Sequence, residues 1–358
     1  EHSRQSIPPM GLTAQGYNGH IFWDTELWMY PPLLALQPQL AKACLDYRMD
    51  RLPKAKQKAH FNGYKGAMYP WETDDTGEEA TPTWALTGIF EQHITSDVAI
   101  AFWNYYTVFQ DKTWLAEHFD VLESTAEFWL SRVFKNQDGS YSIHNVVGAD
   151  EYAQHVNDNA FTNGSVIETL KNTINAARIL NKPVNPKWEE VANKLKLHLK
   201  NGITQNYEGY NGEMIKQADV NLLAYPLNVI TDKAQIKRDL DYYVEKLDKK
   251  DGPAMAHGVL TVLYARLGDI DNAYQAFLNS YKPNARPPFG VFSESANSNN
   301  PYFVTGAGAM LQGVIFGFGG VNLTDQGMTY NKGLLPKSWK SLTIVGLGPD
   351  NKTITIKN

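Results

Sequence analysis

The sequence of 358 residues contains a single cysteine, Cys44, so the chain can form neither an intrachain disulfide nor a metal site built on cysteines. No apolar run approaches the roughly 20 residues that span a bilayer, and no signal peptide is recognisable. The chain also lacks a basic run, and its net charge is −5. We therefore expect no nucleic-acid partner and no membrane partner.

Sequence motifs for several other chemistries are absent as well. The chain has no His-Glu-x-x-His pattern of a metal site and no Gly-x-Ser-x-Gly turn of a serine hydrolase. It has no glycine-rich loop for a phosphate, because Gly306 and Gly308 belong to a long apolar stretch rather than to a strand-turn-helix unit. We expect neither a bound metal nor a cofactor.

Aromatic residues, in contrast, are abundant: the chain has 9 Trp, 19 Tyr and 15 Phe. Most of these rings are expected to pack in the core. Many nevertheless stand next to Asp, Glu, Asn or Gln, as at Trp23-Asp24 and Trp71-Glu72. A sugar ring stacks its C–H face on an aromatic ring and needs planar polar groups for its hydroxyls. These pairs therefore indicate a small oligosaccharide as the ligand.

The hydrophobic spacing predicts a mainly helical chain. Roughly eleven helical segments precede residue 320, and the loops between them carry the aromatic and acidic residues. Helices that alternate with such loops are typical of an α/α toroid, in which inner helices point their loops at a central cavity. The last barrel helix, residues 302–318, is almost wholly apolar and contains glycines that allow close packing.

The segment of residues 20–30 is an unusual helix in this series. It is expected to stop at Pro31-Pro32, because proline cannot continue a helix. It also places Asp24 and Glu26 among Ile, Phe, Leu and Trp residues. Some charge is therefore expected to be buried here, together with a partner or a ligand.

The end of the chain has a different pattern. Residues 342–345 and 352–356 are rich in Thr, Ile and Val and are joined through a Gly-Pro-Asp-Asn turn, which predicts two strands. We therefore expect a barrel domain at 1–320 and a small C-terminal β-sandwich element at 321–358.

Cleavage of a glycosidic bond requires two carboxyl groups, one protonated and one ionised. The candidates in aromatic-flanked loops are Asp24, Glu72, Asp150, Glu151, Asp219 and Glu294. Asp150 and Glu151 stand in a loop that enters a helix, which is a common location for catalytic groups. The alternative is that both are solvated loop charges, with Asn163 or Ser165 as the N-cap of that helix.

Four stretches of the chain carry a family resemblance: GHIFWDTE at 19–26, GAMYPWE at 66–72, DEY at 150–152 and KQADV at 216–220. Together they resemble glycoside hydrolase family 65. That family comprises inverting phosphorylases of α-linked disaccharides and several hydrolases: acid trehalase, a kojibiose-cleaving α-glucosidase and a glucosylgalactosyl-hydroxylysine glucosidase. Its fold, an (α/α)6 barrel between an N-terminal β-sandwich and a C-terminal β domain, is implied for this chain.

The resemblance also implies roles for individual residues. Glu151 would be the general acid, kept neutral by burial beside apolar walls, while Asp150 would orient its loop or bind a hydroxyl. The alternative to a binding role is that Lys216 is an ordinary surface lysine and that Glu72 forms a salt bridge within its loop. His93 and Asp97 would contact the residues of the glucose pocket and hold them in place, without touching the sugar. The glucose pocket would consist of Trp23, Asp24, Trp71, Glu72, Lys216 and Gln217.

The attacking group is either water or phosphate. In the family's phosphorylases, phosphate is held by two adjacent serines before one helix and by a His before the last barrel helix. In this chain the segment that would carry the serine pair reads DGPAMAH at 251–257 and contains no serine. Before the last helix, where the phosphorylases have the His, this chain has Glu294. A carboxylate repels phosphate but can take a proton from water, so Glu294 is the expected general base. This favours an inverting exo-α-glucosidase that releases β-glucose. Among the substrates that the family resemblance implies, we expect a kojibiose-type α-1,2 linkage first.

Other functions stay open: an α-glucosyl disaccharide phosphorylase, an acid trehalase, a glucosylgalactosyl-hydroxylysine glucosidase, or a non-catalytic toroid that binds carbohydrate. The sequence opens on EHSR without Met, and we expect the first barrel helix and an N-terminal β-sandwich, a partner of the barrel, to precede it. A periplasmic or secreted location is the expectation for the compartment, and the oligomeric state is left open.

Overall fold

The computed structural model describes residues 5–12 and 15–358; residues 1–4 and 13–14 of the predicted barrel domain lie outside it. Within the described ranges, six helical segments form a closed ring, each packed against the next. In order these are η2 (Asp24–Met29) with α1 (Tyr30–Leu36), α5 (Ile94–Phe109), α7 (Ala160–Ile179), η3 (Val220–Leu223), α10 (Ala256–Leu267), and α12 (Val304–Gln312) with η4 (Gly313–Phe318).

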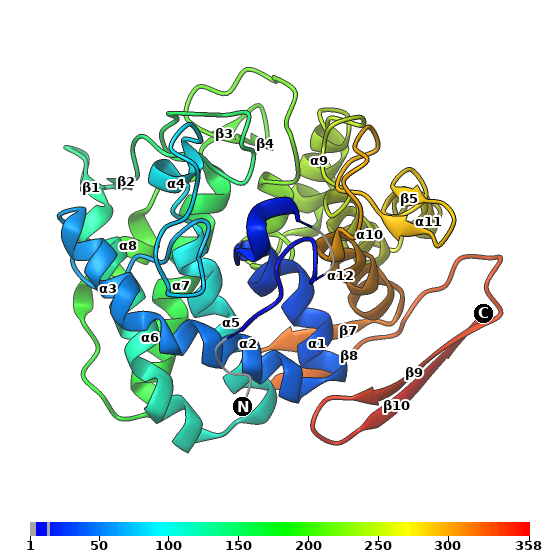
Figure 1. Cartoon of the computed structure of the whole chain (residues 1–358), viewed down its shortest axis with the longest axis horizontal. Coiled ribbons are helices and arrows are strands. Elements are labelled where there is room, and N and C mark those ends of the chain that lie inside the picture. Colours follow the sequence, from blue (N-terminus) through cyan, green and yellow to red (C-terminus); the bar gives the residue numbers. More distant parts are fainter. Residues whose placement is uncertain (1–4, 13–14) are drawn as a thin grey trace.

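Further helices cover this ring from outside (Figure 1). For example, α6 packs on both α5 and α7, and α11 packs on α10. The predicted (α/α)6 barrel is therefore confirmed. The outer helices are α2 (Pro38–Asp50), α3 (Leu52–Phe61), α6 (Lys112–Arg132), α8 (Pro186–Lys194), α9 (Lys233–Val244) and α11 (Ile270–Asn279).

Close approach of the last inner helix to the first closes the ring. A Cβ added at Gly308 of α12 would lie 2.7 Å from the carbonyl oxygen of Trp28 and 2.9 Å from the Cα of Met29. Glycine is thus required where α12 meets η2 backbone to backbone. The prediction that glycines of this apolar helix allow close packing is confirmed at this position.

Short elements occupy the loops. They are η1 (Gly16–Gly19), α4 (Thr87–Phe90) and three two-residue hairpins: β1 (Phe134–Lys135) with β2 (Tyr141–Ser142), β3 (Leu199–Lys200) with β4 (Ile203–Thr204), and β5 (Ala285–Arg286) with β6 (Val291–Phe292). All three hairpins are antiparallel.

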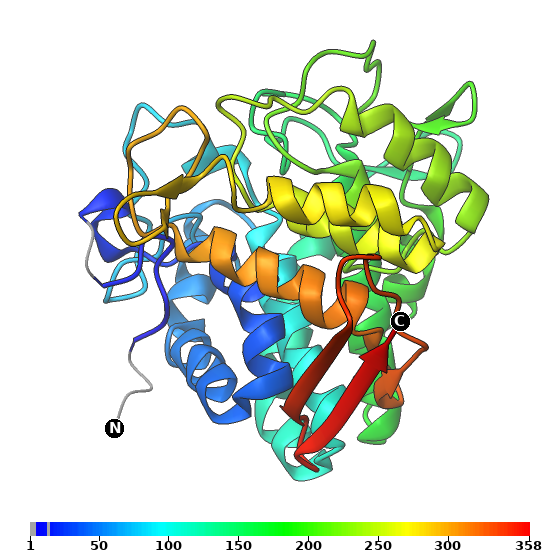
Figure 2. The ribbon, with the colours of Figure 1, turned by 90° about the vertical axis from the view of Figure 1, so that its right-hand side faces the viewer.

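The predicted β character of the C-terminal segment is confirmed, in the form of two separate antiparallel hairpins. The first joins β7 (Val321–Thr324) to β8 (Gly327–Tyr330) and packs on α5. The second joins β9 (Ser341–Leu347) to β10 (Lys352–Lys357) and lies at the surface beside the last barrel helix (Figure 2). Gly348, in its turn, donates its backbone N–H to the carbonyl of Ala35 at the end of α1, at 2.8 Å.

The expected helix stop at Pro31-Pro32 is wrong. The chain changes there from the wider π-helical winding of η2 to the α-helical winding of α1, and both prolines stand in the first turn of α1. A proline is tolerated at this place because first-turn N–H groups need no partner within the helix.

Arg48 of α2 forms a fully buried ion pair with Glu26 of η2. Its Nε and Nη2 donate to the two carboxylate oxygens at 2.6 and 2.9 Å. Its remaining donors reach Thr73 Oγ1 at 2.9 Å and the carbonyl of Phe22 at 3.2 Å. The predicted buried charge near residue 26 is confirmed, and its partner is this guanidinium.

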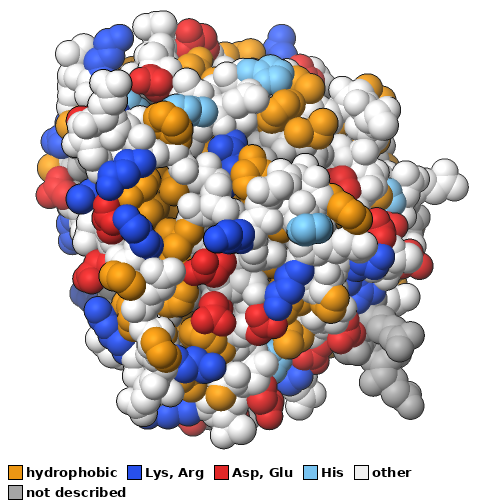
Figure 3. Space-filling model, turned by 90° about the vertical axis from the view of Figure 1, so that its left-hand side faces the viewer, with side chains coloured by type: hydrophobic (Ala, Val, Ile, Leu, Met, Phe, Trp, Pro, Cys, Tyr) orange, Lys and Arg blue, Asp and Glu red, His pale blue; other side chains and the backbone are white. Residues whose placement is uncertain are grey.

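The surface offers no large field of one sign on the face drawn in Figure 3, where acidic and basic side chains are interspersed. Among the described residues, no helix is long and apolar enough to cross a membrane.

Replacing Arg48 with Met should strongly destabilise the barrel, because it leaves the buried Glu26 carboxylate without a partner. The free energy of unfolding, from urea titration, should fall by about 3–5 kcal/mol. A matched control is Lys42→Met on the same helix, since Lys42 forms a partly exposed pair with Asp46. That change should cost about 0.5 kcal/mol or less. Equal losses in the two variants would contradict the assignment.

Candidate active site

Two loops that each carry an aromatic–acid pair lie side by side at one end of the barrel. Ile21 and Thr73 exchange both backbone hydrogen bonds, at 2.9 Å each. This bridge brings Trp23-Asp24 next to Trp71-Glu72, and the centroids of the two indole rings are 6.2 Å apart. Residues separated by about fifty positions thus form one wall.

A cavity of ≈ 470 Å³ opens above this wall. The loops that line it lead into η2, α5, α7, η3, α10 and α12, so it lies at the amino-terminal mouth of the ring. The structure brings all eight residues singled out from the sequence to its surface: Trp23, Asp24, Trp71, Glu72, Glu151, Lys216, Gln217 and Glu294.

The expected burial of Glu151 beside apolar walls is wrong: its side chain is half-buried and paired with a lysine. Two of its predicted neighbours hold it. Lys216 Nζ lies 2.9 Å from Glu151 Oε1, and Gln217 Nε2 donates to the same oxygen at 3.3 Å. Burial alone would lower the pKa of Lys216, but the charge of Glu151 outweighs it and the pKa is raised. Gln217 Oε1 is buried and accepts no hydrogen bond from the described residues.

Asp150 points away from the cavity into the protein. Its Oδ1 accepts the backbone N–H of Lys216 and its Oδ2 accepts the side-chain amide of Asn206, both at 2.8 Å. Asp219 in turn accepts the Asp150 N–H at 3.1 Å. Burial raises the pKa of Asp150 to about 7. Asp150 and Asp219 thus tie the Glu151 loop to the Lys216 loop, in keeping with the orienting role expected for Asp150.

The helix after this loop begins four to six residues earlier than the expected N-caps Asn163 and Ser165 imply. Asn159, not Asn163 or Ser165, is its N-cap, and its Oδ1 accepts the Thr162 N–H at 2.8 Å. Asn163 and Ser165 both lie within α7. The reason is that Asn159 also donates to Asp219 at 2.8 Å, a contact that no local pattern reveals.

Glu294 has a hydrogen-bond donor on each carboxylate oxygen. Tyr17 Oη donates to Oε1 at 2.6 Å, and Asn300 Nδ2 lies 3.2 Å from Oε2. The backbone carbonyl of Glu294 accepts the Ala254 N–H at 2.8 Å. Tyr17 and Asn300 were not expected from the sequence, because their contacts with Glu294 depend on loops that meet only in the folded chain.

A buried ionic cluster supports the aromatic wall. His93 Nε2 is 2.9 Å from Glu91 and its Nδ1 is 2.8 Å from Asp97. Burial alone would lower the pKa of His93, but the two carboxylates outweigh it and raise the pKa to about 10. The ring packs edge-on against Trp23 and Trp71, with centroids at 4.7 and 5.4 Å. This is the supporting position expected for His93 and Asp97.

The two acids of the aromatic–acid pairs have different environments. Glu72 Oε2 lies 3.0 Å from His20 Nδ1, and burial raises the pKa of Glu72. Asp24 accepts the hydroxyl of Thr305 at 2.6 Å. Burial raises the pKa of Asp24 to about 7, against the opposing effect of the Thr305 bond and with a further contribution from Glu294.

The cavity therefore combines two indole walls, acids and amides that can bind hydroxyls, and two carboxyl groups from separate loops. Among residues 5–12 and 15–358, no three or more His, Cys, Asp or Glu side chains are grouped to hold a metal ion.

Comparison with known proteins identifies the family. The model of the glycosyl hydrolase family 65 central catalytic domain matches residues 1–213 and 189–285. The chain belongs to glycoside hydrolase family 65. The predicted resemblance is thereby confirmed.

Similar family 65 proteins include a kojibiose hydrolase of Flavobacterium johnsoniae, 51% identical over 354 residues, covering 98% of this chain and 52% of that protein. A protein-glucosylgalactosylhydroxylysine glucosidase of Dictyostelium discoideum is 41% identical over 362 residues, covering 98% and 50%. The chain thus spans about half the length of these relatives. A solved structure assigned as a kojibiose phosphorylase from human microbiome shares the fold, with a TM-score of 0.83 at 19% identity over 99% of this chain and 58% of that one.

The Asp24→Asn variant should gain stability relative to the wild type as the pH rises. The folded chain keeps the Asp24 proton up to a pKa of about 7, against 3.8 for a free Asp. Ionisation of this buried group therefore opposes folding; the cost is absent below pH about 4 and complete above pH about 7. The difference in unfolding free energy should grow across this window by up to about 4 kcal/mol. A difference that stays constant from pH 4 to 8 would refute this account.

Proposed function

We propose that this chain is the catalytic core of an inverting exo-α-glucosidase that cleaves a kojibiose-type α-1,2 linkage. Glu151 protonates the oxygen between the two sugars, and Glu294 takes a proton from a water molecule on the opposite face of the glucosyl ring. β-Glucose leaves. The observation that carries the proposal is the meeting of Glu151 and Glu294 at one cavity with a pocket of sugar-binding character.

The pocket chemistry supports glucose as the bound unit. Trp23 and Trp71 offer flat apolar faces, while Asp24, Glu72 and Gln217 offer acceptors for hydroxyls. Lys216 binds a hydroxyl and keeps the Glu151 carboxyl in place. Similarity to a kojibiose hydrolase at 51% identity favours kojibiose as the substrate.

The surroundings of Glu294 favour water over phosphate as the attacking group. Pro253 and Met255 line the cavity on this side and offer no side-chain hydrogen-bond donor. Tyr17 and Asn300 donate to both oxygens of Glu294, which holds the carboxylate in one orientation. A phosphate dianion would face this carboxylate without the serine pair that the family's phosphorylases use.

A glucosyl-galactose unit is a second candidate substrate, on the strength of the 41% identical glucosylgalactosylhydroxylysine glucosidase. The cavity rim supports it: Trp84 lines the cavity with 84% of its surface exposed, leaving room for a larger leaving group. A panel of α-glucosyl disaccharides that includes trehalose separates these substrates by kcat/KM.

We further propose that residues 1–320 form the barrel domain and residues 321–358 form a C-terminal β domain. The change from helix to strand at Val321, directly after η4, supports this boundary.

Kojibiose hydrolysis followed by proton NMR tests the reaction. Before mutarotation, the glucose cleaved from the non-reducing end should carry the β-anomeric signal, and the rate should not depend on inorganic phosphate. An initial excess of α-glucose would refute inversion. Formation of glucose 1-phosphate when phosphate is added would assign the protein to the phosphorylases instead.

The Glu294→Gln variant should lose the general base while the pocket stays intact. We expect kcat to fall by about 10²–10⁴-fold, with little change in the affinity for glucose measured by calorimetry. The control is Glu189→Gln, at an exposed position of α8, which should leave turnover unchanged. Turnover near the wild-type rate in Glu294→Gln would remove this residue from the mechanism.

A further inference from the structure

A second large cavity lies at the other mouth of the barrel. It measures ≈ 610 Å³ and is lined by residues from the carboxyl-terminal parts of α5 and α10, by the middle of α7, by the loop after η3 and by the hairpin β7–β8. We call it the far-end cavity. Thr107, which lines it, follows Ile94 at the start of α5 by thirteen residues, about 20 Å of helix. The two cavities are therefore distinct.

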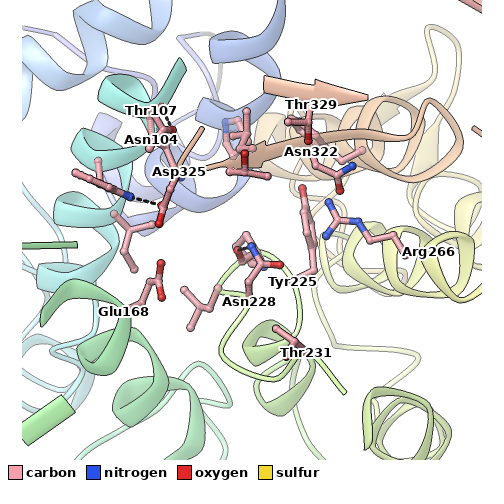
Figure 4. Close-up of a pocket in the computed structure, with 18 of the residues that line it drawn as sticks. Asn104, Thr107, Glu168, Tyr225, Asn228, Thr231, Arg266, Asn322, Asp325 and Thr329 are labelled. Atoms are coloured by element: carbon pink, nitrogen blue, oxygen red, sulfur yellow. Dashed lines mark hydrogen bonds between the residues drawn. The ribbon is translucent and has the colours of Figure 1, made fainter. Parts of the chain in front are cut away.

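Two charged side chains enter the far-end cavity without an ionic partner. Figure 4 shows Glu168 of α7 on one side and Arg266 of α10 on the other. Among the described residues, no cationic side chain forms an ion pair with Glu168, and burial raises its pKa to about 7. Arg266 lies over the ring of Tyr225 at 4.7 Å, and its Nε has no hydrogen-bond partner within the described chain.

Both side chains are only half-buried, and both line the cavity, so their charged groups lie within reach of a bound molecule. A bound molecule with hydroxyl groups would satisfy both, because a hydroxyl can accept from a guanidinium and donate to a carboxylate. Glu168 and Arg266 can therefore serve as hydrogen-bond partners of a ligand in this cavity.

The rest of the lining defines the class of that ligand. Its neutral polar groups include the side chains of Asn104, Asn228, Asn322, Asn331, Thr107 and Thr329. Its charges are mixed, with Glu168 and Asp325 facing Arg266, so neither a phosphate nor a polycation is favoured. Amides and hydroxyls of this number match a molecule that carries many hydroxyls. The volume lies within the range of small-molecule sites.

We propose that the far-end cavity binds an uncharged sugar of one or two rings, independently of the cavity that contains Glu151 and Glu294. The proposal does not depend on the catalytic roles of those two residues.

Equilibrium dialysis with labelled glucose counts the bound molecules per chain. The wild type should bind two, one in each cavity. The double variant Glu168→Leu/Asn104→Leu removes two polar groups from one wall at similar volume and should bind one. Glu123→Leu, at an exposed position of α6, is the matched control and should bind two. A far-UV circular dichroism spectrum like that of the wild type and a cooperative urea transition establish that the double variant is folded.

Each result decides the proposal. If the double variant binds as much glucose as the wild type, the far-end site is refuted. If the wild type binds one molecule and the double variant none, the far-end site stands and glucose binding in the proposed active site fails. If the double variant does not fold, the milder Glu168→Gln replaces it, and its far-end dissociation constant should rise at least about tenfold. An unchanged constant refutes the proposal.

Discussion

The buried guanidinium of Arg48 fixes the relative position of the two aromatic–acid loops. Burying such a charge costs several kcal/mol, and hydrogen bonds with good geometry must offset that cost. Arg48 donates four of them, two to Glu26 of η2, one to the carbonyl of Phe22 just before η2, and one to Thr73 of the other loop. Any relative shift of the loops would leave the charge partly unsatisfied. The position of Trp23 against Trp71 is thus set from within the core.

A second buried charge acts directly beneath the cavity. His93, held between Glu91 and Asp97, presents its ring edge to both indoles. Side chains fixed in this way bind a ligand with little further loss of freedom. The two ionic clusters together make the wall rigid, while Glu151 and Glu294 stand on loops that carry their own hydrogen bonds. In the proposed mechanism, sugar binding and acid–base chemistry therefore fall on different parts of the barrel.

Local patterns in the sequence reveal much of this arrangement. The helical spacing predicts the barrel, and aromatic–acid pairs such as Trp23-Asp24 identify the wall. The prediction of a helix stop at Pro31-Pro32 was wrong because it took no account of a change in helical winding. No local pattern predicts a role for Tyr17, because its partner Glu294 is 277 residues away. The same holds for Thr305, whose partner Asp24 is 281 residues away. The far-end cavity carries no aromatic–acid pair, so its residues resemble ordinary polar positions.

The exposed Trp84 belongs to the rim of the cavity, and its indole forms no hydrogen bond with the described chain. Neither Arg48 nor His93 holds this side chain. Substitutions here would therefore be nearly neutral for folding while they alter the space beside the proposed glucose pocket. The rim can thus change without disturbing the buried charges that fix the wall.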